Sequence, residues 1–198
     1  MSNITMRLGK LSATVAPAAP PVLAEDGTDI TELVALVRDG TDAQKENAAG
    51  ALESLAHSAD NRIPIAKAGG MAPLVALVRD GNDAQKASAA GALWNLAIKF
   101  DENKTAIAKA GGIPPLVALV RDGNDEQKHS AAGALRNLAV NVDNEIAIGK
   151  AGGIPPLVTL VRDGNDEQKR IAAGALGNLA HSAANKIAIA KAKREAGI

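Results

Sequence analysis

Cysteine and tyrosine are absent from this chain of 198 residues, and tryptophan and phenylalanine occur once each. Without cysteine the chain forms no disulfide, thiolate nucleophile or cysteine-based zinc site, and this fits a reducing compartment. Apolar residues still make up 46% of the sequence, and most of them are small aliphatic residues. Such a composition favours closely packed helices over a deep ligand cavity.

An excess of charge of one sign is also lacking, because 22 basic side chains balance 22 acidic ones. Nucleic-acid binding needs a basic footprint, so we expect no nucleic-acid partner. No stretch reaches the roughly 20 apolar residues that cross a bilayer, so we expect no membrane span and a cytoplasmic protein. The sequence has no metalloprotease, dinucleotide-binding, phosphate-loop or nucleophile-elbow motif, so we expect no enzyme activity, cofactor or metal.

The sequence does contain one unit repeated four times. The segment Leu-Val-(Ala/Thr)-Leu-Val-Arg-Asp-Gly begins at Leu33, Leu74, Leu116 and Leu157, at spacings of 41, 42 and 41 residues. Self-similarity at a fixed period of this length indicates a solenoid in which each unit packs against its neighbours.

Each unit has the signals of three helices. In the third unit, Gly111-Gly112 ends a short first helix, and Pro114-Pro115 opens a second helix that carries an apolar face. Asn124 with Gln127 then forms a capping box for a longer third helix. Equivalent boxes stand at Thr41 with Gln44, Asn82 with Gln85, and Asn165 with Gln168.

The two ends of the chain differ from the repeats. We expect residues 1–27 to be an N-terminal tail or arm, because residues 16–21 are proline-rich and therefore extended. An organellar targeting role for this segment stays open. Residues 28–192 are expected to form a single solenoid of about four repeats, with breaks near residues 57, 98, 140 and 182. Residues 183–198 then act as a partial fifth repeat and C-terminal cap.

A unit of about 42 residues that ends in Ala-Gly-Ala-Leu-x-Asn-Leu-Ala, after Gly-Gly and Pro-Pro punctuation, resembles the armadillo repeat. The resemblance implies an all-α fold, a right-handed α-solenoid with three helices per repeat. It also implies that the third helices line a concave groove which binds an extended peptide or protein segment. In that family a ladder of asparagines holds the peptide backbone, and here the ladder positions are Asn95, Asn137, Asn178 and Ser54 in the imperfect first copy.

The chemistry of asparagine supports this role, because its side chain offers both a donor and an acceptor to a peptide backbone. The alternative is that Asn95, Asn137 and Asn178 only bond neighbouring repeats and stiffen the stack. Importin-α-like proteins also carry a tryptophan one turn before the asparagine, where it clamps lysine. This chain has Gly50, Gly91, Gly133 and Gly174 there, as in the β-catenin and plant-type pattern, so recognition of nuclear localisation signals is not expected.

The positions at which the repeats disagree are the candidates for groove specificity. They lie one, seven and eight residues before the ladder, near the same helix face. These candidates are Glu53, Trp94, Arg136, Glu46, His129, Arg170, Ser88 and Ser130. We predict a groove graded from acidic to basic with Trp94 as an aromatic anchor. The alternative is a set of solvated charges around a half-buried tryptophan.

We therefore expect a non-enzymatic scaffold or adaptor whose groove binds an extended segment of another protein. The alternative is a structural subunit or homo-oligomer, with contacts made by the repeat ends or the N-terminal arm.

Overall fold

The computed structural model describes residues 22–24 and 26–198, and this part of the chain contains twelve helices of three alternating kinds. The first helices are α3 (Ala59–Lys67), α6 (Asp101–Lys109), α9 (Val142–Lys150) and α12 (Ala183–Ala196). The second helices are α1 (Ile30–Asp39), α4 (Met71–Asp80), α7 (Ile113–Asp122) and α10 (Ile154–Asp163). The third helices are α2 (Asp42–Leu55), α5 (Asp83–Leu96), α8 (Asp125–Leu138) and α11 (Asp166–Leu179). The predicted all-α solenoid with three helices per repeat is confirmed.

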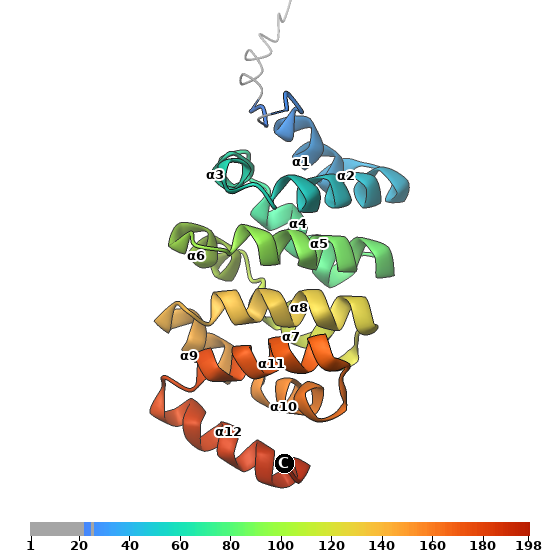
Figure 1. The fold of residues 1–198 in the computed structure, drawn as a ribbon. Helices are drawn as coiled ribbons and strands as arrows, with labels where there is room; N and C mark the ends of the chain where they lie inside the picture. The colour runs from blue at the N-terminus through green and yellow to red at the C-terminus, as the bar shows by residue number, and fades with distance from the viewer. Residues whose placement is uncertain (1–21, 25) are drawn as a thin grey trace, which may run out of the picture.

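The repeats stack along one direction. Figure 1 shows the third helices stacked in one layer, the second helices behind them, and α3, α6 and α9 along one edge. Between the layers runs a continuous core of leucine, isoleucine, valine and alanine, in which Leu93 and Leu135 are fully buried. Ala92 and Ala134 are also fully buried, and their small side chains allow the third helices to lie close together.

The capping boxes expected from the sequence begin all four third helices. In α5 the Asn82 side chain accepts a hydrogen bond from the Gln85 backbone N–H at 2.9 Å. In return the Asn82 backbone N–H donates to Gln85 Oε1 at 3.0 Å. Two N–H groups that the helix itself leaves unpaired are satisfied in this way.

The Gly-Gly pairs form the turns that connect each first helix to the second helix that follows it. Gly111 has φ +78°, a left-handed conformation that costs glycine little. Gly112 is buried, and a Cβ at this position would lie 3.0 Å from Val75 Cγ2 in the preceding repeat. The first glycine therefore permits the turn, and the second permits close packing between repeats.

Two rows of side-chain amides tie each repeat to the one before it, and the sequence analysis did not predict these bonds. In the glutamine row, Nε2 donates to a backbone carbonyl at the start of the preceding third helix: Gln85 to Asp42 at 2.9 Å, Gln127 to Asp83 at 3.0 Å, and Gln168 to Asp125 at 2.9 Å. In the first-helix asparagine row, Nδ2 donates similarly: Asn103 to Arg62 at 3.5 Å, Asn144 to Lys104 at 3.2 Å, and Asn185 to Glu145 at 3.1 Å. These asparagines are buried, so each bond satisfies a polar group that water does not reach.

Both ends of the described part are covered. At the N-terminal end, Leu23 pairs with Asp29 in an isolated bridge, and Ala24 is buried against the first repeat. At the C-terminal end, α12 is longer than the other first helices and packs along α10. Residues 1–21 and 25 of the predicted arm at residues 1–27 lie outside the described residues. The domain boundaries stay a prediction, although residues 22–24 of the predicted arm pack on α1 and its cap.

Candidate functional site

The three ladder asparagines lie in the last turn of their third helices, and each one bonds to the preceding repeat. The Nδ2 atoms of Asn95, Asn137 and Asn178 donate to the backbone carbonyls of Glu53, Trp94 and Arg136, at 3.2, 3.1 and 2.8 Å. The bond between repeats, which the sequence analysis gave as the alternative role, is therefore present. It uses one of the two amide hydrogens of each side chain.

The ladder side chains differ in their exposure and in the polar atoms that stay available to a binding partner. Asn95 is only 8% exposed, and its Nδ2 also lies 3.4 Å from His57 Nδ1. Asn137 and Asn178 are half-buried, and their Oδ1 atoms accept no hydrogen bond from the described part of the chain. Ser54 is exposed in the first repeat. The amide groups open to a partner are thus concentrated in repeats three and four.

The residue before each ladder position lies over a glycine of the following repeat. Glu53 covers Gly91, Trp94 covers Gly133 and Arg136 covers Gly174, and a Cβ on any of these glycines would lie within 3.0 Å of the covering side chain. At Gly50, which no preceding repeat covers, the nearest atom would be Ser88 Oγ at 3.9 Å. The mid-helix glycines, which cost about 1 kcal/mol each relative to alanine, therefore make room for the variable side chains. We call Glu53, Trp94 and Arg136 the covering residues.

Trp94 forms the centre of this surface. Its ring meets the His129 ring edge-to-face, with the centroids 5.2 Å apart and the planes at 69°. Aromatic pairs favour this geometry. Both side chains are half-buried, so the ring is fixed in place while part of it stays accessible.

The other predicted specificity residues are not equally accessible. Glu46 and Arg170 are exposed, Ser88 is half-buried, and Ser130 is buried at 7% exposure. Arg170 forms an ion pair with Glu167 one turn earlier. Its charge is therefore partly neutralised within the fourth repeat.

Two acidic residues that the sequence analysis missed, Glu126 and Glu167, also belong to this surface, and each is electrostatically coupled to a predicted site residue. Burial raises the pKa of Glu53; the His57 charge opposes this rise, and the Glu126 charge adds to it. The hydrogen bond from Arg170 lowers the pKa of Glu167, and the charges of Arg170, His129 and Arg136 lower it further. Glu126 and Glu167 stand where the first two repeats have Ala43 and Ala84. The same comparison of repeats that selected the other candidates therefore contained the signal for them.

Glu53 gives the stability of the protein a pH dependence of known sign. Because the pKa of Glu53 is raised in the folded state, its protonated form favours folding, and this contribution is lost as pH rises through the folded pKa. We expect Glu53→Gln to be more stable than the wild type at pH 7, with a difference that shrinks towards zero below pH ~4. Urea unfolding at several pH values measures this difference.

The exposed Glu46, in the same helix, provides the matched control, Glu46→Gln. A stability gain of Glu53→Gln that is the same at all pH values, or is equalled by the control, would contradict this assignment.

Comparison with known proteins identifies the fold. The family model described as Armadillo/beta-catenin-like repeat matches residues 58–98, 100–140 and 141–181. The chain belongs to the armadillo-repeat family. Armadillo solenoids are generally non-enzymatic scaffolds for protein interaction, and that is the class of function this fold supports. A search of curated proteins returned no match.

Several solved armadillo-like structures are similar to this chain. One is an engineered protein of a structural genomics consortium, 34% identical with TM-score 0.78, over 83% of this chain and 68% of that one. Another is a designed armadillo repeat protein in complex with the peptide (KR)4, 28% identical with TM-score 0.77, over 82% and 70% of the two chains. A third comes from computationally designed armadillo repeat proteins for modular peptide recognition, 25% identical with TM-score 0.78, over 83% and 70%.

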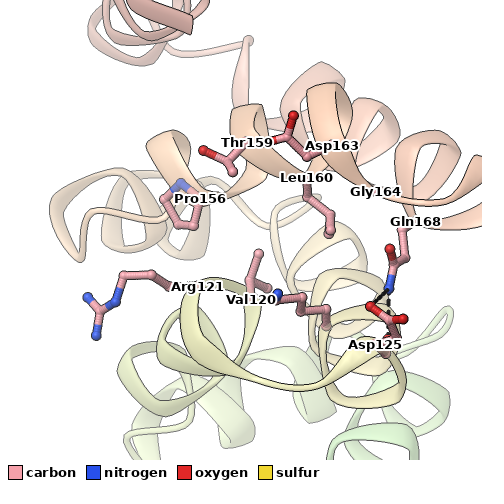
Figure 2. Close-up of a pocket in the computed structure, with 10 residues that line it drawn as sticks. Val120, Arg121, Asp125, Pro156, Thr159, Leu160, Asp163, Gly164 and Gln168 are labelled. Carbon is pink, nitrogen blue, oxygen red and sulfur yellow. Dashed lines mark hydrogen bonds between the residues drawn. The ribbon is translucent and has the colours of Figure 1, made fainter.

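Three equivalent clefts between armadillo repeats lie away from the ladder, where the turns join second to third helices. Figure 2 shows the cleft between repeats three and four, with an apolar floor of Val120, Pro156 and Leu160 and the bond from Gln168 to Asp125 at one side. Its volume is ≈ 150 Å³, and those of the other two are ≈ 310 and 210 Å³. Small-molecule sites are usually about 300 to 1,000 Å³. Two of the clefts are smaller than this and the third is at the lower limit, so we assign all three to the packing between repeats.

Among the described residues, no helix is long and apolar enough to cross a membrane, and no group of three metal-ligating side chains is found.

Proposed function

We propose that this armadillo protein is a scaffold that binds an extended segment of another protein along the surface of its third helices. The observation that carries the proposal is the row of covering residues, each held over a glycine beside a ladder asparagine. These fixed, partly exposed side chains present a preorganised surface, and preorganisation lowers the entropic cost of binding.

The spacing of the ladder suits an extended chain. Packed helices lie about 8 to 10 Å apart, and alternate residues of an extended peptide lie about 7 Å apart. The free N–H and Oδ1 of Asn137 and Asn178 can therefore pair with backbone groups of one bound strand without reading its side chains. Specificity would then come from the covering residues.

The charges along the surface favour one order of side chains in the partner. Glu46 and Glu53 make the first-repeat end acidic. Arg136 and Arg170 lie in repeats three and four, where Arg170 pairs with Glu167. A complementary segment carries basic residues at the first end, an apolar residue near Trp94 and an acidic residue near Arg136. Electrostatic complementarity of this kind sets register and orientation more than affinity.

Peptides of about ten residues, long enough to cross three repeats at ~3.3 Å per residue, test this order. One peptide carries lysines, a central leucine and aspartates; a second carries the same residues in reverse order. We expect the wild type to prefer one order at least about tenfold, or 1.4 kcal/mol. The exchanged variant Glu53→Arg with Arg136→Glu should prefer the other order.

The matched control is Arg79→Glu with Asp80→Arg, which exchanges an exposed ion pair at the end of α4 and should leave the preference unchanged. Equal affinity of the wild type for both orders, measured by calorimetry, would contradict the predicted charge order. Absence of binding to either peptide would contradict the proposed peptide-binding surface itself.

A further inference from the structure

The C-terminal end of the stack (Figure 1) leaves one flank of α11 without a following third helix. In the first three repeats the equivalent alanines Ala49, Ala90 and Ala132 are fully buried, because the next third helix packs on them. Their counterpart in repeat four, Ala173, is exposed. α12 packs along α10 far more than along α11, so it does not replace the missing third helix.

A pocket of ≈ 250 Å³ opens at this flank. It is lined by Val161 of α10, Ala173, Leu176 and Gly177 of α11, and Ile189 and Lys193 of α12. Unlike the three clefts between repeats, it lies where a neighbouring element is missing. An apolar cavity of about 150 Å³ already holds a benzene molecule, so this pocket has room for one aliphatic side chain of a partner.

Gly177 keeps the pocket open. It stands where the first three repeats have the covering residues Glu53, Trp94 and Arg136, whose side chains extend onto the next third helix. A Cβ at Gly177 would meet no atom within 4 Å. The pocket therefore continues the row of covering residues and belongs to the third-helix surface.

The wall that α12 forms is fixed at both ends. Near its start, Asn185 Nδ2 donates to the Glu145 carbonyl at 3.1 Å, and the Ser182 backbone N–H donates to the Glu145 carboxylate. Near its end, the Ala196 carbonyl accepts a hydrogen bond from Arg162 Nη1 at 3.4 Å. The pocket is therefore preformed, and a bound side chain needs little further ordering of the protein.

Basic groups stand on both sides of the pocket. On the repeat-three side, Arg136 lies over Gly174, the residue that follows Ala173 in the pocket wall. On the α12 side, Lys193 is exposed and has no ion pair within the described part of the chain. An occupant that carries a carboxylate beside its apolar side chain is complementary to this arrangement.

We propose that the pocket binds an aliphatic side chain of the segment that lies along the third helices, next to an acidic residue of that segment between Arg136 and Lys193. The inference rests on the proposed function and adds a terminal specificity site to it. The partner then carries leucine, isoleucine or valine directly beyond its acidic residues. A further repeat from a second copy would need the flanks of both α10 and α11, and α12 already covers the first of these.

Two extended forms of the preferred charge-ordered peptide test the pocket. One continues beyond its aspartates with two leucines, and the other continues with two alanines. Two positions are varied because alternate side chains of an extended chain point to opposite sides, so one of them faces the protein. We expect the wild type to bind the leucine form at least about tenfold more tightly in calorimetric titration. The methyl signals of Val161 and Ile189 should shift further with the leucine form.

Gly177→Leu should remove this preference, because its own side chain fills the pocket, and should leave the affinity for the alanine form unchanged. Lys193→Glu should weaken the binding of both forms at least about threefold, because it repels the aspartates. Lys191→Glu is the matched control, because Lys191 makes the same charge change in α12 but does not line the pocket. Far-UV circular dichroism checks that each variant is folded.

Equal affinity of the wild type for the leucine and alanine forms would overturn this inference and leave the proposed function standing. Absence of binding to either form would overturn both. A preference for leucine that Gly177→Leu leaves intact would place the leucine elsewhere and would also overturn the inference, as would equal effects of Lys193→Glu and Lys191→Glu.

Discussion

Gly133→Ala is expected to lower the free energy of unfolding by up to about 2 kcal/mol, although alanine is the better helix former. A Cβ at this position would lie within 3.0 Å of the Trp94 ring, which the His129 ring supports from another side. Overpacking of this kind costs about 1 to 3 kcal/mol, and the gain in helix propensity offsets about 1 kcal/mol of it. Urea unfolding measures the difference, and the single tryptophan reports the displaced ring by fluorescence.

Gly50→Ala is the matched control, because the same position in the first repeat has no covering side chain within 3.4 Å. This variant should gain up to about 1 kcal/mol from helix propensity alone. In a Trp94→Ala background, Gly133→Ala should become stabilising as well. If Gly133→Ala and Gly50→Ala changed stability in the same direction, the covering role of Trp94 would be wrong.

Asn137→Ala and Asn144→Ala are each expected to lower the free energy of unfolding by about 1 to 3 kcal/mol. Both side chains donate one N–H to a backbone carbonyl of the preceding repeat, at 3.1 and 3.2 Å. Removal of the donor leaves that carbonyl without its side-chain partner at an interface between repeats. The exposed Asn47 makes no such bond, so Asn47→Ala should stay within about 0.5 kcal/mol of the wild type. If Asn144→Ala lowered the free energy of unfolding no more than Asn47→Ala does, the structural role of these amides would be contradicted.

The sequence was sufficient for the parts of the fold that depend on neighbouring residues. Helix caps such as Asn82 with Gln85 and turns such as Gly111-Gly112 act within a few residues, and the 41- to 42-residue period shows that they recur. The bonds between repeats could not be predicted in this way. Gln85 was assigned only as a capping residue, although its Nε2 reaches a carbonyl 43 positions earlier.

The candidate site was predictable only as a set of positions. Repeat comparison selected Glu53, Trp94 and Arg136, but it did not show which side chains lie over the glycines one turn before the ladder. These contacts join successive repeats, because each glycine receives the covering residue of the repeat before it. Ser130 was included because it varies, but burial removes most of its surface from any partner.

Binding affinity in the pair Asn137→Ala and Asn144→Ala tests the central claim most directly, since both variants lose an equivalent bond between repeats. Only Asn137 lies on the third-helix surface; Asn144 is buried at the first-helix edge. Calorimetric titration with the preferred charge-ordered peptide, under conditions where both variants are folded, should show about a tenfold loss of affinity for Asn137→Ala and none for Asn144→Ala. Equal affinity of the two variants would contradict the account, because the ladder would then only hold the repeats together.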